Sequence, residues 1–413
     1  MNLVATLRPF RALRPRPAEA PRIAAVPYDV VSAEEARALA DRNPLSFLRV
    51  SRAEIELPAG TDPYSHDVYD RAAQNFARLK ESALVVEDVP SLYLYRLRLG
   101  AHEQVGLAAC YALDEYDGNV IKKHERTRPD KEDDRTRHML ALGAQTGPVF
   151  LVYRACADID HLVAEAIKAA PLVDFEAEDG VRHTLWRVDG ANRDRLVELA
   201  ERIPSLYIAD GHHRAASAAR ARAELQKDRL KGSSVDDGAE AASFLAVAFP
   251  ADRVQILPYN RTVKDLGGLS PDAFLQAVRG AFDIEKGPAT PVRRGDIAMY
   301  FQGGWHTLRP RVPQDRADAI ASLDVSVLQD RLLAPVLKIA DVRSDTRIEF
   351  VGGARGTAEL ERLVDSGRAA VAFSLFPVAV DDLMAVSDAG SIMPPKSTWF
   401  EPKLRDGLLI HAI

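Results

Sequence analysis

The segment SLYIADGHHRAASAARARAELQKDRL, residues 205–230, contains the clearest change of structure in the chain. Its apolar beginning predicts a strand over Ser205–Ala209, and its Ala- and Arg-rich remainder predicts a helix from about His212 to Leu230. Upstream, residues 183–188 predict a strand and residues 193–202 a helix. Together these elements predict a βαβ-like stretch that ends in a long helix.

The rest of the chain alternates helices and strands at uneven spacing. Residues 91–99 and 104–113 predict a hairpin that turns at Gly100, and residues 129–144 and 271–282 predict helices. This spacing fits neither a bundle nor a doubly wound sheet, so we expect an α+β fold with mixed sheets. The polar stretch at residues 231–240 predicts a loop, and we expect two parts, residues 1–235 and 236–413.

Composition and charge narrow the class of protein. The 413 residues are 47% hydrophobic and 28% charged, which is ordinary for a globular protein without a membrane span. The net charge of −6 is spread along the chain and argues against a nucleic-acid or membrane partner. Two isolated cysteines and the lack of an apolar leader predict a reduced, cytoplasmic protein.

The junction between strand and helix, Asp210 to Arg214, is the strongest candidate for chemistry. A helix start presents unpaired N–H groups and a partial positive charge, which suit an anion such as phosphate. Gly211 lets the backbone approach closely, and Arg214 can bind phosphate oxygens in a bidentate way. Asp210 fits a helix cap, a magnesium ligand or a base. A helix cap without a ligand and a zinc site are the alternatives, although His212 and His213 point about 100° apart on a helix.

Three other segments carry chemically useful side chains. The segment KKHERT, residues 122–127, brings His124 and Glu125 together with basic groups and a hydroxyl, and it suits either a catalytic loop or a solvated one. Asp29 lies in the turn-forming stretch VPYDV, where an acid also serves as a turn former. Lys396 lies in the rigid turn MPPKST, which suits a phosphate contact or a structural loop.

These segments, in this order, resemble the DUF1015 family along essentially the whole chain. The resemblance implies a relation to the ParB/sulfiredoxin superfamily, whose members bind nucleotides through a Gly-x-His-Arg-like loop at a helix start. Some of those relatives are free-serine kinases with an Asp-Gly-His-x-Arg element, to which Asp210–Arg214 is similar. The matching stretches are VPYDVVS from Val26, NPLSFLRV from Asn43, KKHERT from Lys122, ADGHHR from Ala209, LPYNR from Leu257, TRIEFVGG from Thr346 and MPPKSTWFEPKL from Met393.

The resemblance implies a nucleotide-dependent kinase of a small hydroxyl compound, with free serine converted to O-phosphoserine as the first reaction to test. It implies ATP or ADP as the donor, and phosphoryl transfer usually needs Mg²⁺, whose ligands are oxygens. A nucleotide-binding regulatory module without turnover and a phosphoester hydrolase or nuclease are the alternatives. The expected catalytic residues are Asp210, Glu125, His124 and Asp29, and the expected phosphate-binding residues are Gly211, His212, His213, Arg214 and Lys396.

Overall fold

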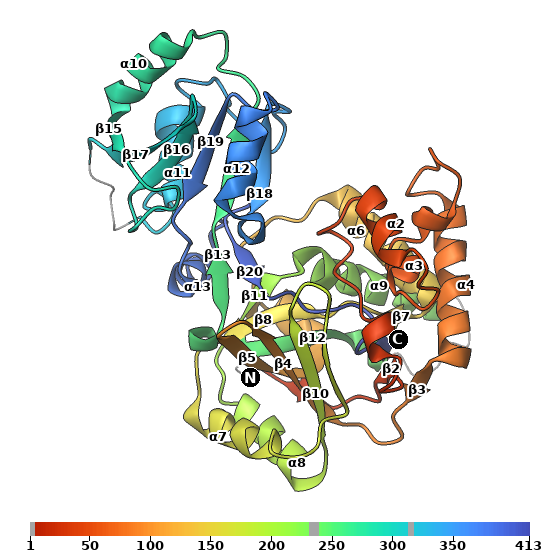
Figure 1. The fold of residues 1–413 in the computed structure, drawn as a ribbon. Helices are drawn as coiled ribbons and strands as arrows, with labels where there is room; N and C mark the ends of the chain where they lie inside the picture. The colour runs from red at the N-terminus through yellow and green to blue at the C-terminus, as the bar shows by residue number, and fades with distance from the viewer. Residues whose placement is uncertain (1–4, 231–238, 313–317) are drawn as a thin grey trace. The chain divides into compact units, whose positions relative to one another are not determined.

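The computed structural model describes residues 5–230, 239–312 and 318–413 and shows two compact units (Figure 1). Unit 1 contains residues 1–254 and 402–413, and unit 2 contains residues 255–401. The expected division at 235/236 lies outside the described residues, and the units divide instead between Val254 and Gln255. The chain also returns to unit 1 at Pro402, which the sequence did not indicate.

Unit 1 is built on a nine-stranded mixed sheet in the order β6-β11-β8-β12-β5-β4-β10-β9, with β1 paired to β5. Two pairs, β11 with β6 and β12 with β8, are parallel, and the other pairs are antiparallel. The fold is therefore α+β, as expected. The strands are β1 Leu7–Arg8, β4 Leu92–Leu99, β5 His102–Ala112, β6 Ile121–Lys122, β8 Val149–Tyr153, β9 Val173–Glu176, β10 Arg182–Val188, β11 Leu206–Asp210 and β12 Ser243–Pro250.

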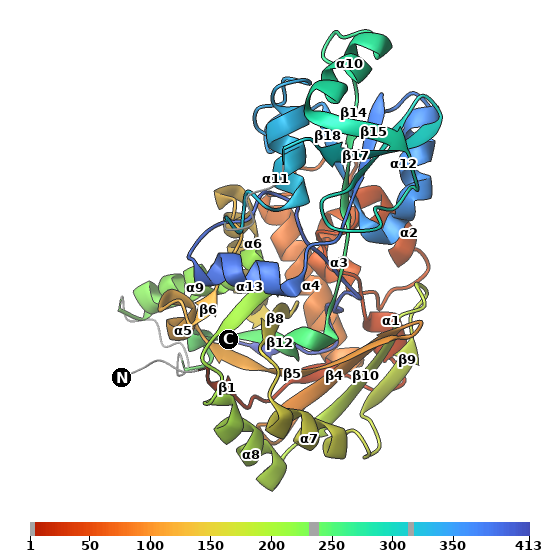
Figure 2. The same ribbon diagram turned by 90° about the vertical axis from the view of Figure 1, so that its left-hand side faces the viewer.

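Helices cover both faces of this sheet (Figures 1 and 2). Helices α7 and α8 lie against one face, and α4, α6 and α9 lie on the other side. Helix α2 begins with the capping box that Ser32 and Glu35 predict. The helices of unit 1 are α1 Ala20–Ile23, α2 Ala33–Ala40, α3 Leu48–Ser51, α4 His66–Ser82, α5 Leu113–Asp117, α6 Pro129–Leu142, α7 Ala157–Ala166, α8 Gly190–Ala200 and α9 His212–Leu230.

The local predictions around the large sheet hold, including the strand–helix–strand order of β10, α8 and β11. The hairpin β4–β5 forms as expected, with its turn at Gly100. Strands β10 and β11, expected to flank α8 in a βαβ-like unit, belong to the same sheet but are separated by β8, β12, β5 and β4. Pairing with distant segments therefore decides where each strand lies.

Residues 402–413 run back into unit 1 and are fixed there at several points. Ala25 and Asp406 exchange backbone hydrogen bonds of 3.1 and 2.9 Å, and Ile410 bridges to Leu13. The Arg405 guanidinium donates to the Asp179 carboxylate and, over 3.2 Å, to Nε2 of the buried His183. The short strands of this region are β2 Leu13–Pro15 with β3 Leu84–Val86, and β7 Ala144–Gln145 with β21 His411–Ala412.

Unit 2 has its own six-stranded antiparallel sheet in the order β15-β17-β16-β19-β14-β18. A separate strand pair joins β13 to β20. The strands are β13 Gln255–Leu257, β14 Tyr259–Val263, β15 Phe282–Lys286, β16 Ile297–Phe301, β17 Gly304–Pro310, β18 Ile348–Gly352, β19 Val371–Leu375 and β20 Trp399–Glu401. The helices are α10 Pro271–Ala281, α11 Asp324–Leu328, α12 Gly356–Asp365 and α13 Val380–Asp388.

Within the described ranges, every helix is too short or too polar to cross a membrane.

Candidate functional site

The end of β11 and the start of α9 form the centre of the candidate site. Strand β11 is buried from Leu206 to Ala209, and its register against β8 shifts between Ile208 and Asp210. Gly211 then adopts a φ of +94°, which side-chain-bearing residues rarely take, and the helix begins at His212. The first-turn N–H groups of an α-helix have no partner within the helix, so the start of α9 is of the kind that suits an anion.

The segment KKHERT lies directly against this helix start. Strand β6 pairs in parallel with β11, so the residues that follow the two strands leave the sheet at the same edge. The rings of His124 and His212 meet edge to face with centroids 4.5 Å apart. The backbone N–H of His124 donates to Nε2 of His212 over 3.4 Å, and a Glu125 carboxylate oxygen lies 3.6 Å from Nδ1 of His212. The two loops therefore share one site.

Two histidines of this site, His124 and His212, are buried and neutral. Burial lowers the pKa of the His124 imidazole to about 4 and holds the pKa of His212 well below its usual range. Nε2 of His213 accepts the backbone N–H of Arg128 over 3.1 Å. Nε2 of His212 and Nε2 of His213 therefore both accept backbone N–H groups of the neighbouring loop.

Asp210 is paired with a residue that the sequence reasoning missed, Lys403. The Lys403 ammonium lies 3.4 Å from the Asp210 carboxylate, and the Lys403 side chain is 13% exposed. Burial raises the pKa of the Asp210 carboxyl, but the charges of Lys403 and Arg214 outweigh that effect and hold the pKa well below its usual range. Asp210 is thus an ionised carboxylate beside the helix start.

Arg214 is buried and bonded within the protein. Its Nη1 donates to the Pro148 carbonyl over 2.8 Å, and its Nη2 donates to an Asp29 carboxylate oxygen over 3.4 Å. Burial lowers the pKa of Arg214, but the carboxylates of Asp29 and Asp210 raise it further, so the guanidinium keeps its charge. The structure therefore brings Asp29 to the site, while both terminal nitrogens expected to grip phosphate already have protein partners.

Lys396 belongs to unit 2, where its ammonium lies 5.6 Å from the centroid of the Tyr259 ring. For the part of the chain that the structure describes, no group of three or more His, Cys, Asp or Glu side chains could hold a metal ion.

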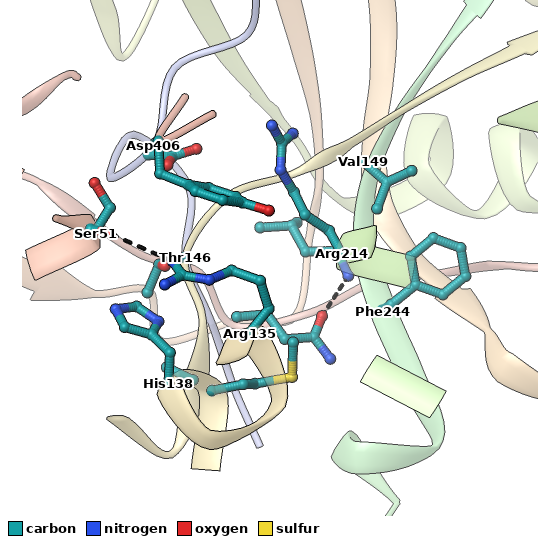
Figure 3. A pocket seen from close by; sticks show the side chains of 14 residues that line it. Ser51, Arg135, His138, Thr146, Val149, Arg214, Phe244 and Asp406 are labelled. Atoms are coloured by element: carbon teal, nitrogen blue, oxygen red, sulfur yellow. Dashed lines mark hydrogen bonds between the residues drawn. The ribbon is translucent and has the colours of Figure 1, made fainter. Parts of the chain in front are cut away.

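A small cavity lies next to the first turn of α9 (Figure 3). It is lined by Tyr28, Arg135, Arg214 and Asp406, among others. The Arg135 guanidinium lies 4.2 Å and that of Arg214 6.0 Å from the centroid of the Tyr28 ring. Burial raises the pKa of the Asp406 carboxyl to about 7, although the Arg214 charge acts in the opposite direction. Lys403 lies within the stretch MPPKSTWFEPKL, and Asp406 follows that stretch by two residues, but neither carries a local sign of its contacts in unit 1.

Comparison with known proteins finds one family model, described as "protein of unknown function (DUF1015)", that matches residues 7–326. No curated protein matches the chain. Similar solved structures include a variant of a free serine kinase in complex with AMP, at 13% identity and a TM-score of 0.35, covering 73% of this chain and 92% of that one. A conserved hypothetical protein from Pyrococcus furiosus has the same identity and TM-score, with 73% and 94% covered. C-terminally truncated SbnI from Staphylococcus aureus is 12% identical at a TM-score of 0.37, with 72% and 85% covered.

Proposed function

This chain belongs to the DUF1015 family, and from the geometry of its site we propose that it binds a nucleotide at the start of α9 and transfers a phosphoryl group to a small hydroxyl compound. The observation that carries the proposal is the placement of an ionised carboxylate, Asp210, directly before an anion-binding helix start. An anion site alone would not need an ionised acid at its edge. Phosphoryl transfer does, because the acceptor hydroxyl must be oriented next to the donor phosphate.

The helix start supplies the phosphate contacts. The N–H groups of residues 211–214 and the positive end of α9 face the donor phosphates and stabilise the charge that spreads over the transferred group. The Lys403 ammonium adds a positive charge beside Asp210. Asp29 orients Arg214, and Glu125 orients His212, so both acids act on the site through a neighbour.

Asp210 accepts a hydrogen bond from the acceptor hydroxyl and directs its oxygen at the terminal phosphorus of ATP or ADP. The new O–P bond forms as the bond from phosphorus to the bridging oxygen breaks. The hydroxyl proton passes through Asp210 to solvent, and the nucleotide with one phosphate fewer leaves. A carboxylate with a lowered pKa is a weak base, but phosphoryl transfer depends more on position and charge than on proton removal.

Mg²⁺ fits this site only as an ion shared with the donor. Protein sites for Mg²⁺ often use one or two carboxylates together with substrate phosphates, and Asp210 and Glu125 are carboxylates at the helix start that would hold the ion. Bound there, the ion would neutralise phosphate charge.

The test is to incubate the protein with free serine and either ATP or ADP in the presence of Mg²⁺, and to detect O-phosphoserine by mass spectrometry. Other small hydroxyl compounds form the rest of the panel. We expect Asp210→Asn to keep nucleotide binding and to lose turnover. Asp174→Asn is the matched control. Asp174 lies on the edge strand β9 and pairs with Arg182 of β10, so this substitution should leave turnover unchanged.

Nucleotide binding without turnover is the second candidate, and the low basicity of Asp210 is the observation that favours it. A nucleotide that binds while no hydroxyl compound is phosphorylated would select this candidate. Nucleotide cleavage without an acceptor would instead indicate a hydrolase. If no nucleotide binds, the proposal is wrong.

A further inference from the structure

A buried histidine on another part of the large sheet is bonded to the segment that carries Lys403. His183 lies on β10, which four other strands separate from β11. Nε of Arg405 donates to Nε2 of His183 over 3.2 Å, and the Tyr95 hydroxyl lies 2.8 Å from Nδ1 of the same ring. The side chains of His183 and Tyr95 are fully buried, and Arg405 is 4% exposed. Each nitrogen of the ring therefore has a partner in the core of unit 1.

The neighbours of His183 fix its protonation. A guanidinium can only donate hydrogen bonds, so Nε2 of His183 accepts, and the ring proton lies on Nδ1, which donates to the Tyr95 hydroxyl. Burial and the Arg405 charge hold the pKa of His183 well below its usual range, so the ring is neutral. The Phe175 ring of β9 stacks on it with centroids 5.4 Å apart. His183 is thus a neutral acceptor with a fixed orientation.

Arg405 is held through both its side chain and its backbone. Its guanidinium donates to the Asp179 carboxylate as well as to His183, and its backbone N–H donates to the Tyr95 hydroxyl over 3.4 Å. The Asp179 side chain is 48% exposed, so His183 is the acceptor that the buried core supplies. A buried cation is costly when its acceptors are removed, so Arg405 depends on His183 to keep its position.

Lys403 is only two residues from this anchor. Consecutive Cα atoms are about 3.8 Å apart, so the Cα atoms of Lys403 and Arg405 are at most roughly 7 Å apart. Leu404 between them is 3% exposed, which limits the movement of the backbone further. The Lys403 ammonium lies 3.4 Å from the Asp210 carboxylate, and an ion pair at that distance depends on where the lysine backbone is held.

We propose that His183 is a positioning residue for the candidate site: it holds Arg405, and Arg405 holds Lys403 against Asp210. The inference rests on the proposed function, in which Lys403 supplies positive charge beside Asp210 at the start of α9. The alternative is a purely structural role, in which His183 contributes to the stability of unit 1 without any effect on Lys403.

Chemical labelling of Lys403 tests the inference without any nucleotide. The full chain is treated with N-hydroxysuccinimidyl acetate, and acetylation of each lysine is followed by mass spectrometry, with Lys168 on the surface as the reference for the reagent. His183→Leu removes the acceptor, so Lys403 should react about tenfold faster or more. His183→Gln keeps an acceptor and a donor, so it should restore most of the protection.

Thr184→Val is the matched control. Thr184 follows His183 on β10 and is equally buried, but it faces the opposite side of the sheet, where its hydroxyl donates to Asp174 over 2.9 Å. This variant should lower stability and change the labelling of Lys403 by no more than about twofold. Circular dichroism and urea unfolding identify the variants that fold. Arg405→Met breaks the same link from its other side, so it should also expose Lys403 and replaces His183→Leu if that variant does not fold.

The pH profile of the reaction separates positioning from a structural role. When Lys403 moves away, burial raises the pKa of the Asp210 carboxyl with less opposition. In His183→Leu, the acidic limb of the plot of kcat/KM against pH should therefore move to higher pH. Adding His183→Leu to Lys403→Met should move the limb no further than Lys403→Met alone, because the group through which His183 acts is gone. A structural role would leave the limb in place.

The outcomes distinguish this inference from the proposed function. The inference is overturned if Lys403 reacts at the unaltered rate in folded His183→Leu, or equally fast in Thr184→Val. If Lys403 becomes reactive in His183→Leu but no phosphoryl transfer occurs with any nucleotide, the positioning stands and the proposed function fails. If transfer occurs and the acidic limb does not move in His183→Leu, the proposed function stands and the inference fails.

Discussion

Gly211→Ala should lower both the stability of unit 1 and its affinity for nucleotide. At a φ of +94°, a residue with a Cβ is strained by about 1–3 kcal/mol. The added Cβ would lie 3.4 Å from Val149 Cα and from Nη1 of Arg214, which is ordinary contact, so the backbone angle accounts for most of the cost. Relief of the strain requires rotation of the peptide that aims the first-turn N–H groups of α9, and we expect phosphate affinity to fall by about tenfold, or about 1.4 kcal/mol.

Gly100→Ala is the matched control. Gly100 also has a positive φ, +58°, in the β4–β5 turn, and a Cβ there meets nothing within 4 Å. This variant should cost about 1–2 kcal/mol of stability and leave nucleotide affinity unchanged. Urea unfolding followed by circular dichroism measures stability, and titration calorimetry with ADP measures affinity. The reasoning is refuted if Gly211→Ala binds ADP as tightly as Gly100→Ala does.

Three further predictions concern charge and packing in unit 1. Lys403→Met removes the positive charge paired with Asp210, so the pKa of the Asp210 carboxyl should rise. The acidic limb of the plot of kcat/KM against pH should then move to higher pH. A limb that does not move would contradict the pairing. The pKa of His124 is lowered from 6.5 to about 4 in the folded state, so its contribution to stability is present above pH 6.5 and lost as the pH falls toward 4. His124→Asn should therefore make urea midpoints less dependent on pH in that window, and an equally steep dependence would argue against a buried neutral ring. The Ile410 side chain is fully buried, so Ile410→Ala should lower the free energy of unfolding by about 2–5 kcal/mol, measured by urea unfolding. Val86 is 63% exposed, so Val86→Ala should change that free energy little.

The local pattern of the sequence predicted the strand–helix junction at Gly211 well. The strand and helix on either side of Gly211 follow from hydrophobic pattern and composition over a few neighbouring residues. Such features are encoded over short stretches, so a single sequence reveals them. Both His124 and His212 were expected site residues, but the sequence did not show that their loops meet; the contact arises because β6 and β11 are parallel neighbours.

The remaining features depend on contacts between distant residues. Lys403 is 193 positions from Asp210, and nothing near it in the sequence indicates the ion pair. The separation of β10 from β11 is likewise decided by strands that come from elsewhere in the chain. Pairing over long sequence distances leaves no periodic signal, so the order of the sheet and the division into units could not be predicted.

The return of residues 402–413 to unit 1 has a consequence for the order of events during synthesis. A ribosome makes all of unit 2 between the body of unit 1 and the segment that carries Lys403 and Asp406. A nascent chain that contains only the first 254 residues therefore lacks the partner of Asp210 and one wall of the cavity. Domains tend to fold as they emerge, and here unit 1 must wait in an incomplete form until unit 2 has been made. Completion of the surroundings of Asp210 is thus coupled to the translation of the whole inserted unit.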